Sequence, residues 1–106
     1  KQLRTKLSLL CDAGSLGWRP CIIIVGGQIF NENDVAEACG ECQYLDRSTS
    51  TWKYLASMPT PRWACAVVIQ DKFLYVIGGM QDEQVLQTVE RLDLVTKEWA
   101  SMPEMP

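Results

Sequence analysis

Two apolar runs that end in paired glycines constrain this chain more than any other feature of its sequence. The runs are "CIIIVGGQ" and "LYVIGGM", and each is followed by a polar loop, a segment ending in Leu-Asp, a short turn, a tryptophan and Ala-Ser-Met-Pro. Gly26 and Gly78 lie 52 positions apart, and Trp52 and Trp99 lie 47 apart. A repeat of about 50 residues matches one blade of a β-propeller.

The second copy predicts four strands. Val, Ile, Tyr, Phe and Trp dominate its apolar runs, as a sheet prefers. The expected strands are "RWACAVVIQ" (62–70), "KFLYVIGG" (72–79), "TVERLDLV" (88–95) and "EWASM" (98–102), with a tight turn at Asp71–Lys72. Four short antiparallel strands make one blade. The sequence therefore predicts an all-β fold of about two four-stranded antiparallel blades.

Three segments are expected along the chain. Residues 21–59 form an incomplete first blade that lacks its first strand, and residues 60–106 form a second repeat. Residues 1–20 are expected to be a linker or the end of an upstream helical domain, because leucines recur there at helical spacing. These leucines are Leu3, Leu7 and Leu10. The alternative is that residues 1–10 supply the missing first strand.

The double glycines and spaced tryptophans resemble kelch repeats, especially those of the BTB–kelch family. The matching residues are Gly26, Gly27 and Trp52 in the first copy, and Gly78, Gly79 and Trp99 in the second. "MPTPRW" (58–63) is similar to the family's junction between blades. Leu45 and Leu92 depart from the family pattern, which usually has Tyr seven residues before the Trp. The resemblance covers residues 21–106.

The resemblance implies a function as well as a fold. It implies a protein-interaction module, the substrate-recognition kelch domain of an adaptor for a cullin-RING E3 ubiquitin ligase. The remaining blades are expected from a longer parent chain, since propellers close with four to eight blades. The alternative is a kelch protein that acts as an actin or cytoskeletal scaffold.

Composition excludes several other classes. Residues 21–106 carry a net charge of −6 within a total of −3, which argues against a nucleic-acid surface. No apolar run is long enough to span a bilayer, so no membrane association is expected. Five cysteines in a loose pattern indicate a reducing compartment, and a cytoplasmic or cytoskeleton-associated location is expected.

Catalytic chemistry is not expected. The absence of histidine removes imidazole-based triads and His-ligated metals. "CGEC" (Cys39, Cys42) has the spacing of a zinc or redox motif, but no second such pair accompanies it. Asp46 and Asp93 occupy equivalent repeat positions, which favours a role in turns over a catalytic pair. We expect no enzyme activity, no metal and no cofactor.

Loops on one face of a propeller are the expected binding site. Residues 28–38, 59–64 and 80–87 connect strands on the same face of an up-and-down blade, and loops on a rigid scaffold often carry function. The acidic loops favour a protein partner segment that contains Lys or Arg. The candidate residues are Gln28, Asn31, Glu32, Asn33, Trp63, Ala64, Met80, Gln81, Asp82 and Glu83. Trp63 is predicted either to anchor a peptide or to belong to the core.

Overall fold

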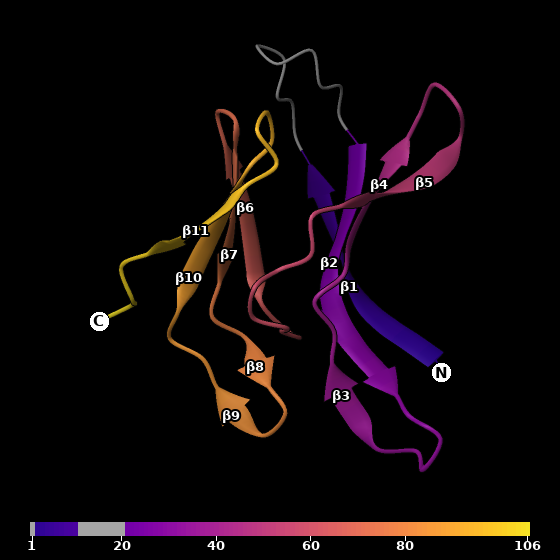
Figure 1. The fold of residues 1–106 in the computed structure, drawn as a ribbon, viewed down its shortest axis with the longest axis vertical. Coiled ribbons are helices and arrows are strands. Elements are labelled where there is room, and N and C mark those ends of the chain that lie inside the picture. Colours follow the sequence, from indigo (N-terminus) through magenta and orange to yellow (C-terminus); the bar gives the residue numbers. More distant parts are fainter. Residues whose placement is uncertain (1, 11–20) are drawn as a thin grey trace.

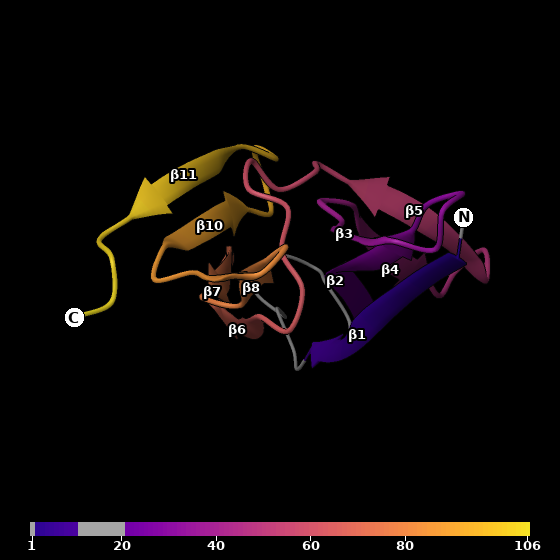
Figure 2. The same ribbon diagram turned by 90° about the horizontal axis from the view of Figure 1, so that it is seen from below.

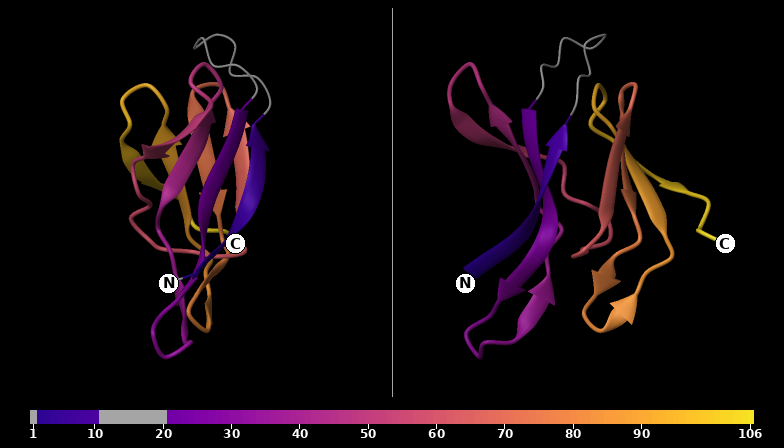
Figure 3. Two further views of the ribbon diagram at one scale, coloured as in Figure 1. Left: turned by 90° about the vertical axis from the view of Figure 1, so that its right-hand side faces the viewer. Right: turned by 180° about the vertical axis from the view of Figure 1, so that it is seen from behind.

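A computed structural model describes residues 2–10 and 21–106, with side chains described from residue 22 onward. Within this part of the chain the regular structure consists of β-strands alone. Two four-stranded antiparallel sheets stand side by side, and each has the shape of a propeller blade (Figure 1). The views from below, from one side and from behind show the two sheets facing each other across one interface (Figures 2 and 3).

The first blade has four strands in the order β1-β2-β4-β5. A fifth, short strand, β3 (Ala36–Ala38), folds back on the end of β2. The four main strands are β1 (Gln2–Leu10), β2 (Cys21–Phe30), β4 (Cys42–Asp46) and β5 (Thr51–Leu55).

The second blade repeats this order as β6-β7-β10-β11. Between β7 and β10 the chain forms a separate small hairpin of β8 (Met80–Gln81) and β9 (Gln84–Val85). The four main strands are β6 (Ala66–Gln70), β7 (Phe73–Ile77), β10 (Val89–Asp93) and β11 (Trp99–Met102). The predicted all-β fold with four-stranded blades is confirmed.

The helix expected near the start of the chain is wrong for Gln2–Leu10. This segment is strand β1, and it pairs with β2 on both sides of a register shift between Arg4 and Lys6. Leu3 and Leu7 also alternate, together with Leu9, with polar or charged residues, so this stretch fits the strand period of two as well, although Leu10 does not. β1 therefore completes the first blade, as the alternative prediction held. Residues 11–20, the remainder of the expected linker, lie outside the described residues.

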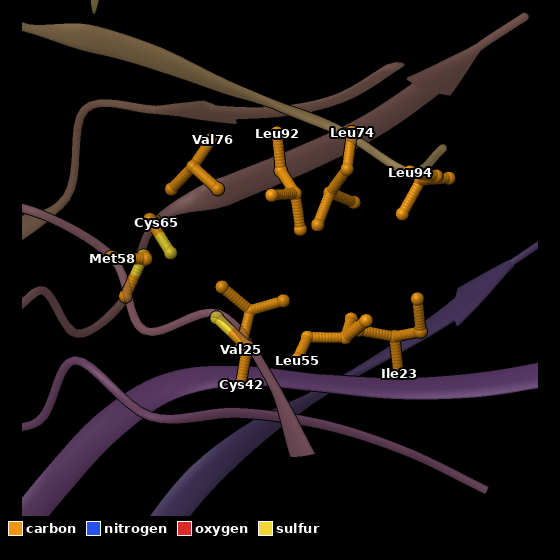
Figure 4. Close-up of a cluster of buried hydrophobic side chains, with 10 residues drawn as sticks. All are labelled: Ile23, Val25, Cys42, Leu55, Met58, Cys65, Leu74, Val76, Leu92 and Leu94. Atoms are coloured by element: carbon orange, nitrogen blue, oxygen red, sulfur yellow. The ribbon is translucent and has the colours of Figure 1, made fainter. Parts of the chain in front are cut away.

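The hydrophobic core lies between the two blades. Residues that alternate along the strands point from each sheet toward the other, as the period of a strand requires (Figure 4). The first blade contributes Ile23, Val25, Cys42 and Leu55, and the second contributes Leu74, Val76, Leu92 and Leu94. Met58 and Cys65, on either side of the junction, complete the cluster.

Arg62 joins the two blades at this junction. Its carbonyl accepts the N–H of Gly27 in the first blade at 2.9 Å. Its fully buried guanidinium donates to the carbonyls of Gly78 and Thr88 and pairs with Glu90 at 2.8 Å in the second blade. One residue thus satisfies backbone and carboxylate groups from both sheets.

The paired glycines are explained by close backbone approach at the same place. Gly26 has a φ of +62°, and a Cβ built there would collide with the carbonyl oxygen of Arg62. Gly79 has a φ of +90°, and a Cβ there would lie 2.8 Å from the carbonyl oxygen of Trp63. Contacts this short leave no room for a Cβ, and the left-handed φ values add to the preference for glycine at both positions.

Candidate functional site

Two hairpins project from the same end of the two blades. In the first blade, β3 pairs with Gln28–Phe30 at the end of β2. In the second, β8 and β9 form their own ladder just beyond β7. Figure 1 shows both hairpins at the end of the molecule opposite the turn between β6 and β7. Both arise from connections that the sequence placed on one face.

A groove of about 810 Å³ lies between these hairpins. This size is within the range of ligand sites. Polar, apolar and acidic side chains from both blades line it, and Trp63 from the junction joins them. The lining residues are Gln28, Val35, Ala36, Glu37, Trp63, Gln81, Asp82, Glu83 and Gln84.

The loop that forms one wall is held in shape by Asn31. Its side-chain oxygen accepts the N–H groups of Asn33 and Val35 at 2.9 and 3.1 Å. Its side-chain nitrogen donates to Glu37 at 3.1 Å, which orients a carboxylate of the groove. Asp34 completes this tight loop with a φ of +61°. Asn31 therefore positions the wall of the groove instead of lining it.

Trp63 connects the junction to the second hairpin. Its backbone N–H and carbonyl exchange hydrogen bonds with Met80 at 2.9 and 2.8 Å. The side chain is partly buried and lines the groove. Its indole Nε1 is buried and has no hydrogen-bond partner among the described residues. The indole thus combines the two predicted roles, because it is packed in the fold and also borders the groove.

The charged residues that line the groove are all acidic. Glu37, Asp82 and Glu83 line it, and Glu32 and Asp34 lie in the adjoining loop. Residues 28–38 and 80–88 contain no Lys or Arg. Clustered like charges favour a ligand of opposite charge.

The structure brings half of the ten candidate residues to the groove. Gln28, Trp63, Gln81, Asp82 and Glu83 line it together. The others lie in the loop tip or at the junction, namely Asn31, Glu32, Asn33, Ala64 and Met80. Sequence reasoning missed four lining residues, which are Val35, Ala36, Glu37 and Gln84. All four lie in residues 28–38 or 80–87, the connections expected to bind a partner, and this position was the only sequence feature that pointed to them.

The two cysteines of the "CGEC" motif are part of the folded interior and, within the described residues, do not form a reactive or metal-binding site. Cys39 and Cys42 are buried thiols, and burial raises the pKa of Cys42 to about 12. Such a thiol stays protonated at neutral pH, which makes it a poor nucleophile or metal ligand. Among the described residues, no group of three or more His, Cys, Asp or Glu side chains is placed to hold a metal ion.

Asp46 and Asp93 shape equivalent turns, as predicted. Asp46 accepts the N–H of Ser48 at 3.0 Å and pairs with Lys53 at 2.7 Å. Asp93 accepts the N–H of Val95 at 2.8 Å and pairs with Lys72 at 3.2 Å. Each aspartate therefore fixes its own hairpin.

Comparison with known proteins agrees with this fold. The family model of the kelch motif matches residues 61–106. Kelch-like protein 38 of Danio rerio is 32% identical over 93 residues, covering 82% of this chain and 15% of its own length. An F-box/kelch-repeat protein of Arabidopsis thaliana is 30% identical over 100 residues, covering 90% and 23%. Human kelch-like protein 15 is 24% identical over 85 residues, covering 80% and 14%.

The solved structure of YjhT superposes with a TM-score of 0.69 at 13% sequence identity. The match covers 81% of this chain and 35% of that one, and at this identity it concerns the fold alone. The chain spans 14% to 23% of the length of the three curated relatives. Within the described residues, no helix is long and apolar enough to cross a membrane.

These findings define a kelch-type β-propeller fold. The chain is a kelch-repeat chain that resembles the kelch-like family. Kelch repeats indicate a protein-interaction module, and such modules are generally non-catalytic.

Proposed function

We propose that the groove between the two hairpins binds a segment of a protein partner. The observation that carries this proposal is the convergence of hairpins from two successive blades around Trp63. A half-buried tryptophan offers a large, rigid contact surface, which is the kind of residue that dominates binding energy at interfaces. Its unpartnered Nε1 can be satisfied if side chains around it move and a ligand oxygen accepts the hydrogen bond.

The partner segment carries Lys or Arg in this proposal. Five carboxylates lie in residues 28–38 and 80–87, which form most of the groove and its rim, and these two segments contain no Lys or Arg. Opposite charge across an interface speeds association and selects the partner. The resemblance to kelch-like proteins supports a further role, substrate recognition for an adaptor of a cullin-RING ubiquitin ligase.

The cytoplasm is the proposed location. Cys39 and Cys42 are both thiols, which fits a reducing compartment. Nucleic acid and membrane are not among the proposed partners, because the groove is acidic.

Peptide binding tests the groove directly. Fluorescein-labelled peptides rich in Lys and Arg, and a matched set rich in Asp and Glu, are titrated into the chain and followed by polarisation. The basic set should bind and weaken as salt rises, since screening shortens the reach of surface charge. Equal affinity for both sets, or no binding by either, would contradict the proposal.

A triple variant locates the binding. Glu37→Gln, Asp82→Asn and Glu83→Gln together should weaken the basic peptides by about tenfold, the sum of several exposed charge contacts. Asp71→Asn is the matched control, because this exposed aspartate lies in the β6–β7 turn at the opposite end. An equal loss in the control would show that overall charge, and not the groove, attracts the peptides.

The adaptor role has its own test. Affinity purification of the protein from cells, followed by mass spectrometry, should recover a cullin scaffold. Recovery of cytoskeletal proteins without a cullin would contradict the adaptor role while leaving groove binding intact.

A further inference from the structure

Strand β3 has one edge in a ladder and one edge open. On the first edge its partner is β2, with Glu37 opposite Ile29. Figures 1 and 3 show β3 between the end of β2 and β8, so the second edge faces the second hairpin. Among the described residues, no ladder joins β3 to β8. The open edge of β3 therefore borders the groove between the two hairpins.

Hydrogen bonds at both ends of the β2–β3 ladder determine which backbone groups point to the open edge. The N–H of Cys39 donates to the carbonyl of Gly27 at 2.8 Å, and the N–H of Asn31 donates to the carbonyl of Val35 at 3.0 Å. In an antiparallel ladder, hydrogen-bonded pairs alternate with pairs whose backbone groups point away from each other. Inward-bonded positions therefore recur at every second residue of β3, counted back from Cys39.

Ala36 and Ala38 are the residues of β3 whose backbone groups point away from β2. Glu37, which lies between them, bonds inward. Each alanine is partly exposed and presents one N–H and one carbonyl to the open edge, and neither group is hydrogen-bonded to another described residue. Ala36 also lines the groove. Unpaired backbone groups along the edge of a strand are a template for a further strand.

Backbone of the junction already pairs with both hairpins at their base. The N–H of Arg62 donates to the carbonyl of Cys39 at 3.3 Å, directly after the end of β3. Trp63 forms an antiparallel bridge with Met80 at the start of β8. The remainder of the β3 edge, nearer the tip of its hairpin, has no such partner in the described chain. The groove lies beside this part of the edge.

We propose that the partner segment binds in the groove as an extended strand that adds antiparallel to the open edge of β3. The inference rests on the proposed function of the groove and specifies the conformation of the partner. In strand addition, main-chain hydrogen bonds give affinity and alternate side chains give specificity. Antiparallel pairing is the more stable kind per residue, and each ladder of the described chain has it.

Glu37 determines which residue of the added strand is basic. Its carboxylate is exposed, lines the groove and accepts a hydrogen bond from Asn31 Nδ2 at 3.1 Å. Side chains of directly opposite residues lie on the same face of a sheet, and opposite charges in such a pair are favourable. The partner therefore places Lys or Arg opposite Glu37. Its two flanking residues lie opposite Ala36 and Ala38 and direct their backbone groups to β3.

N-methylated peptides test this arrangement without altering the protein. The probe is a short fluorescein-labelled peptide of alternating Lys and Val, titrated into the 106-residue chain and followed by polarisation. With lysine opposite Glu37, the valine N–H groups point to β3 and the lysine N–H groups point away. Methylation of the valine nitrogens should weaken binding at least about tenfold, because it removes the hydrogen-bond donors. Methylation of the lysine nitrogens, the matched control, should change the affinity less than about twofold.

The outcomes separate strand addition from the proposed function of the groove. If the unmethylated peptide does not bind, the groove proposal fails and strand addition fails with it. If the peptide binds, and both methylated forms keep its affinity or lose it equally, the groove binds a partner but strand addition is overturned. A loss confined to the lysine-methylated peptide would contradict the antiparallel register on Glu37.

Amide hydrogen exchange locates the new hydrogen bonds in the protein. With saturating peptide, the amides of Ala36 and Ala38 should exchange at least about tenfold more slowly. Val85 is the matched control, because it does not line the groove and its N–H points outward from the second hairpin. The latter follows from alternation, since the bonded pair next to it is Leu86 and Gly79 at 2.8 Å. Unchanged exchange at both alanines, or equal slowing at Val85, would overturn strand addition.

Discussion

At the residue scale, the junction between the blades depends on a few residues that are held by close contacts from both sheets. Gly26 and Gly79 permit backbone from the junction to pass against the strands that precede them. Arg62 fills the space beside them and binds groups of both sheets. These positions were visible in the sequence as "VGG", "IGG" and "PRW". Their physical role required the structure, because Arg62 binds Gly27 and Glu90, which are 35 and 28 positions away in the sequence.

Gly26→Ala is expected to destabilise the chain by at least about 2 kcal/mol, from left-handed strain and from the collision with the Arg62 carbonyl. Gly40→Ala is the control, because Gly40 lacks a positive φ and its nearest neighbour atom would lie 3.2 Å away. Urea unfolding followed by circular dichroism measures both. Equal loss in the two variants would contradict the account of the paired glycines.

Arg62→Met is expected to cost about 3–5 kcal/mol, because it leaves the buried Glu90 carboxylate without its partner. Adding Glu90→Leu should recover part of the loss, since the unpaired charge is then gone. The stability of Arg62→Lys should lie between those of the unchanged chain and Arg62→Met, because lysine keeps the positive charge but lacks the planar guanidinium with its several donors. Urea unfolding of the set is the measurement, and an unchanged midpoint for Arg62→Met would exclude the proposed role.

At the element scale, most strands could be predicted from the apolar runs in the sequence and the alternation of apolar and polar residues. The four strands of the second blade were expected within a few residues of their observed bounds. The first expected strand begins at Ala66 instead of Arg62, because Ala64 takes a φ of +56° at the junction. β1 was missed as a strand because the four-residue spacing of Leu3 and Leu7 fits both the helical and the strand period. β3, β8 and β9 span only two or three residues each, which is too short for periodicity.

The candidate site, like the strands, could be predicted in part from the sequence. The sequence placed the correct connections on one face, because strand order alone decides where loops emerge. It could not separate residues that line the groove from those that shape it. Asn31 was predicted to bind a partner because it is a polar residue in a loop, yet its side chain accepts hydrogen bonds from the backbone of that loop. Val35 and Glu37 became groove residues only because β3 folds back on β2.

The two aspartate turns predict an acid response. The hydrogen bond and ion pair from Lys53 hold the pKa of Asp46 well below its usual range, and hydrogen bonds from Thr96 and Val95 lower the pKa of Asp93. A lowered folded pKa gives stability that is present above the unfolded value of about 3.9 and is lost as pH falls further. Urea unfolding between neutral pH and strong acid should therefore show a falling midpoint. The Asp46→Asn/Asp93→Asn double variant should flatten that fall, and an undiminished fall would contradict the prediction.

At the scale of the whole molecule, two similar blades and one interface account for the fold. The core lies between the two sheets, because a single sheet is one layer and can bury its apolar face only against another element. The same interface positions the two hairpins that form the groove, so binding depends on the packing of the blades. Fold and proposed site thus rest on one contact between sheets.

That contact is the central claim, and methyl NOE spectroscopy tests it most directly. The account predicts NOEs between methyl groups of Ile23, Val25 and Leu55 in the first blade and those of Leu74, Leu92 and Leu94 in the second. A mixture of differently labelled copies separates contacts within a chain from contacts between chains. NOEs confined to each sheet, with none joining the two sets within one chain, would contradict the account.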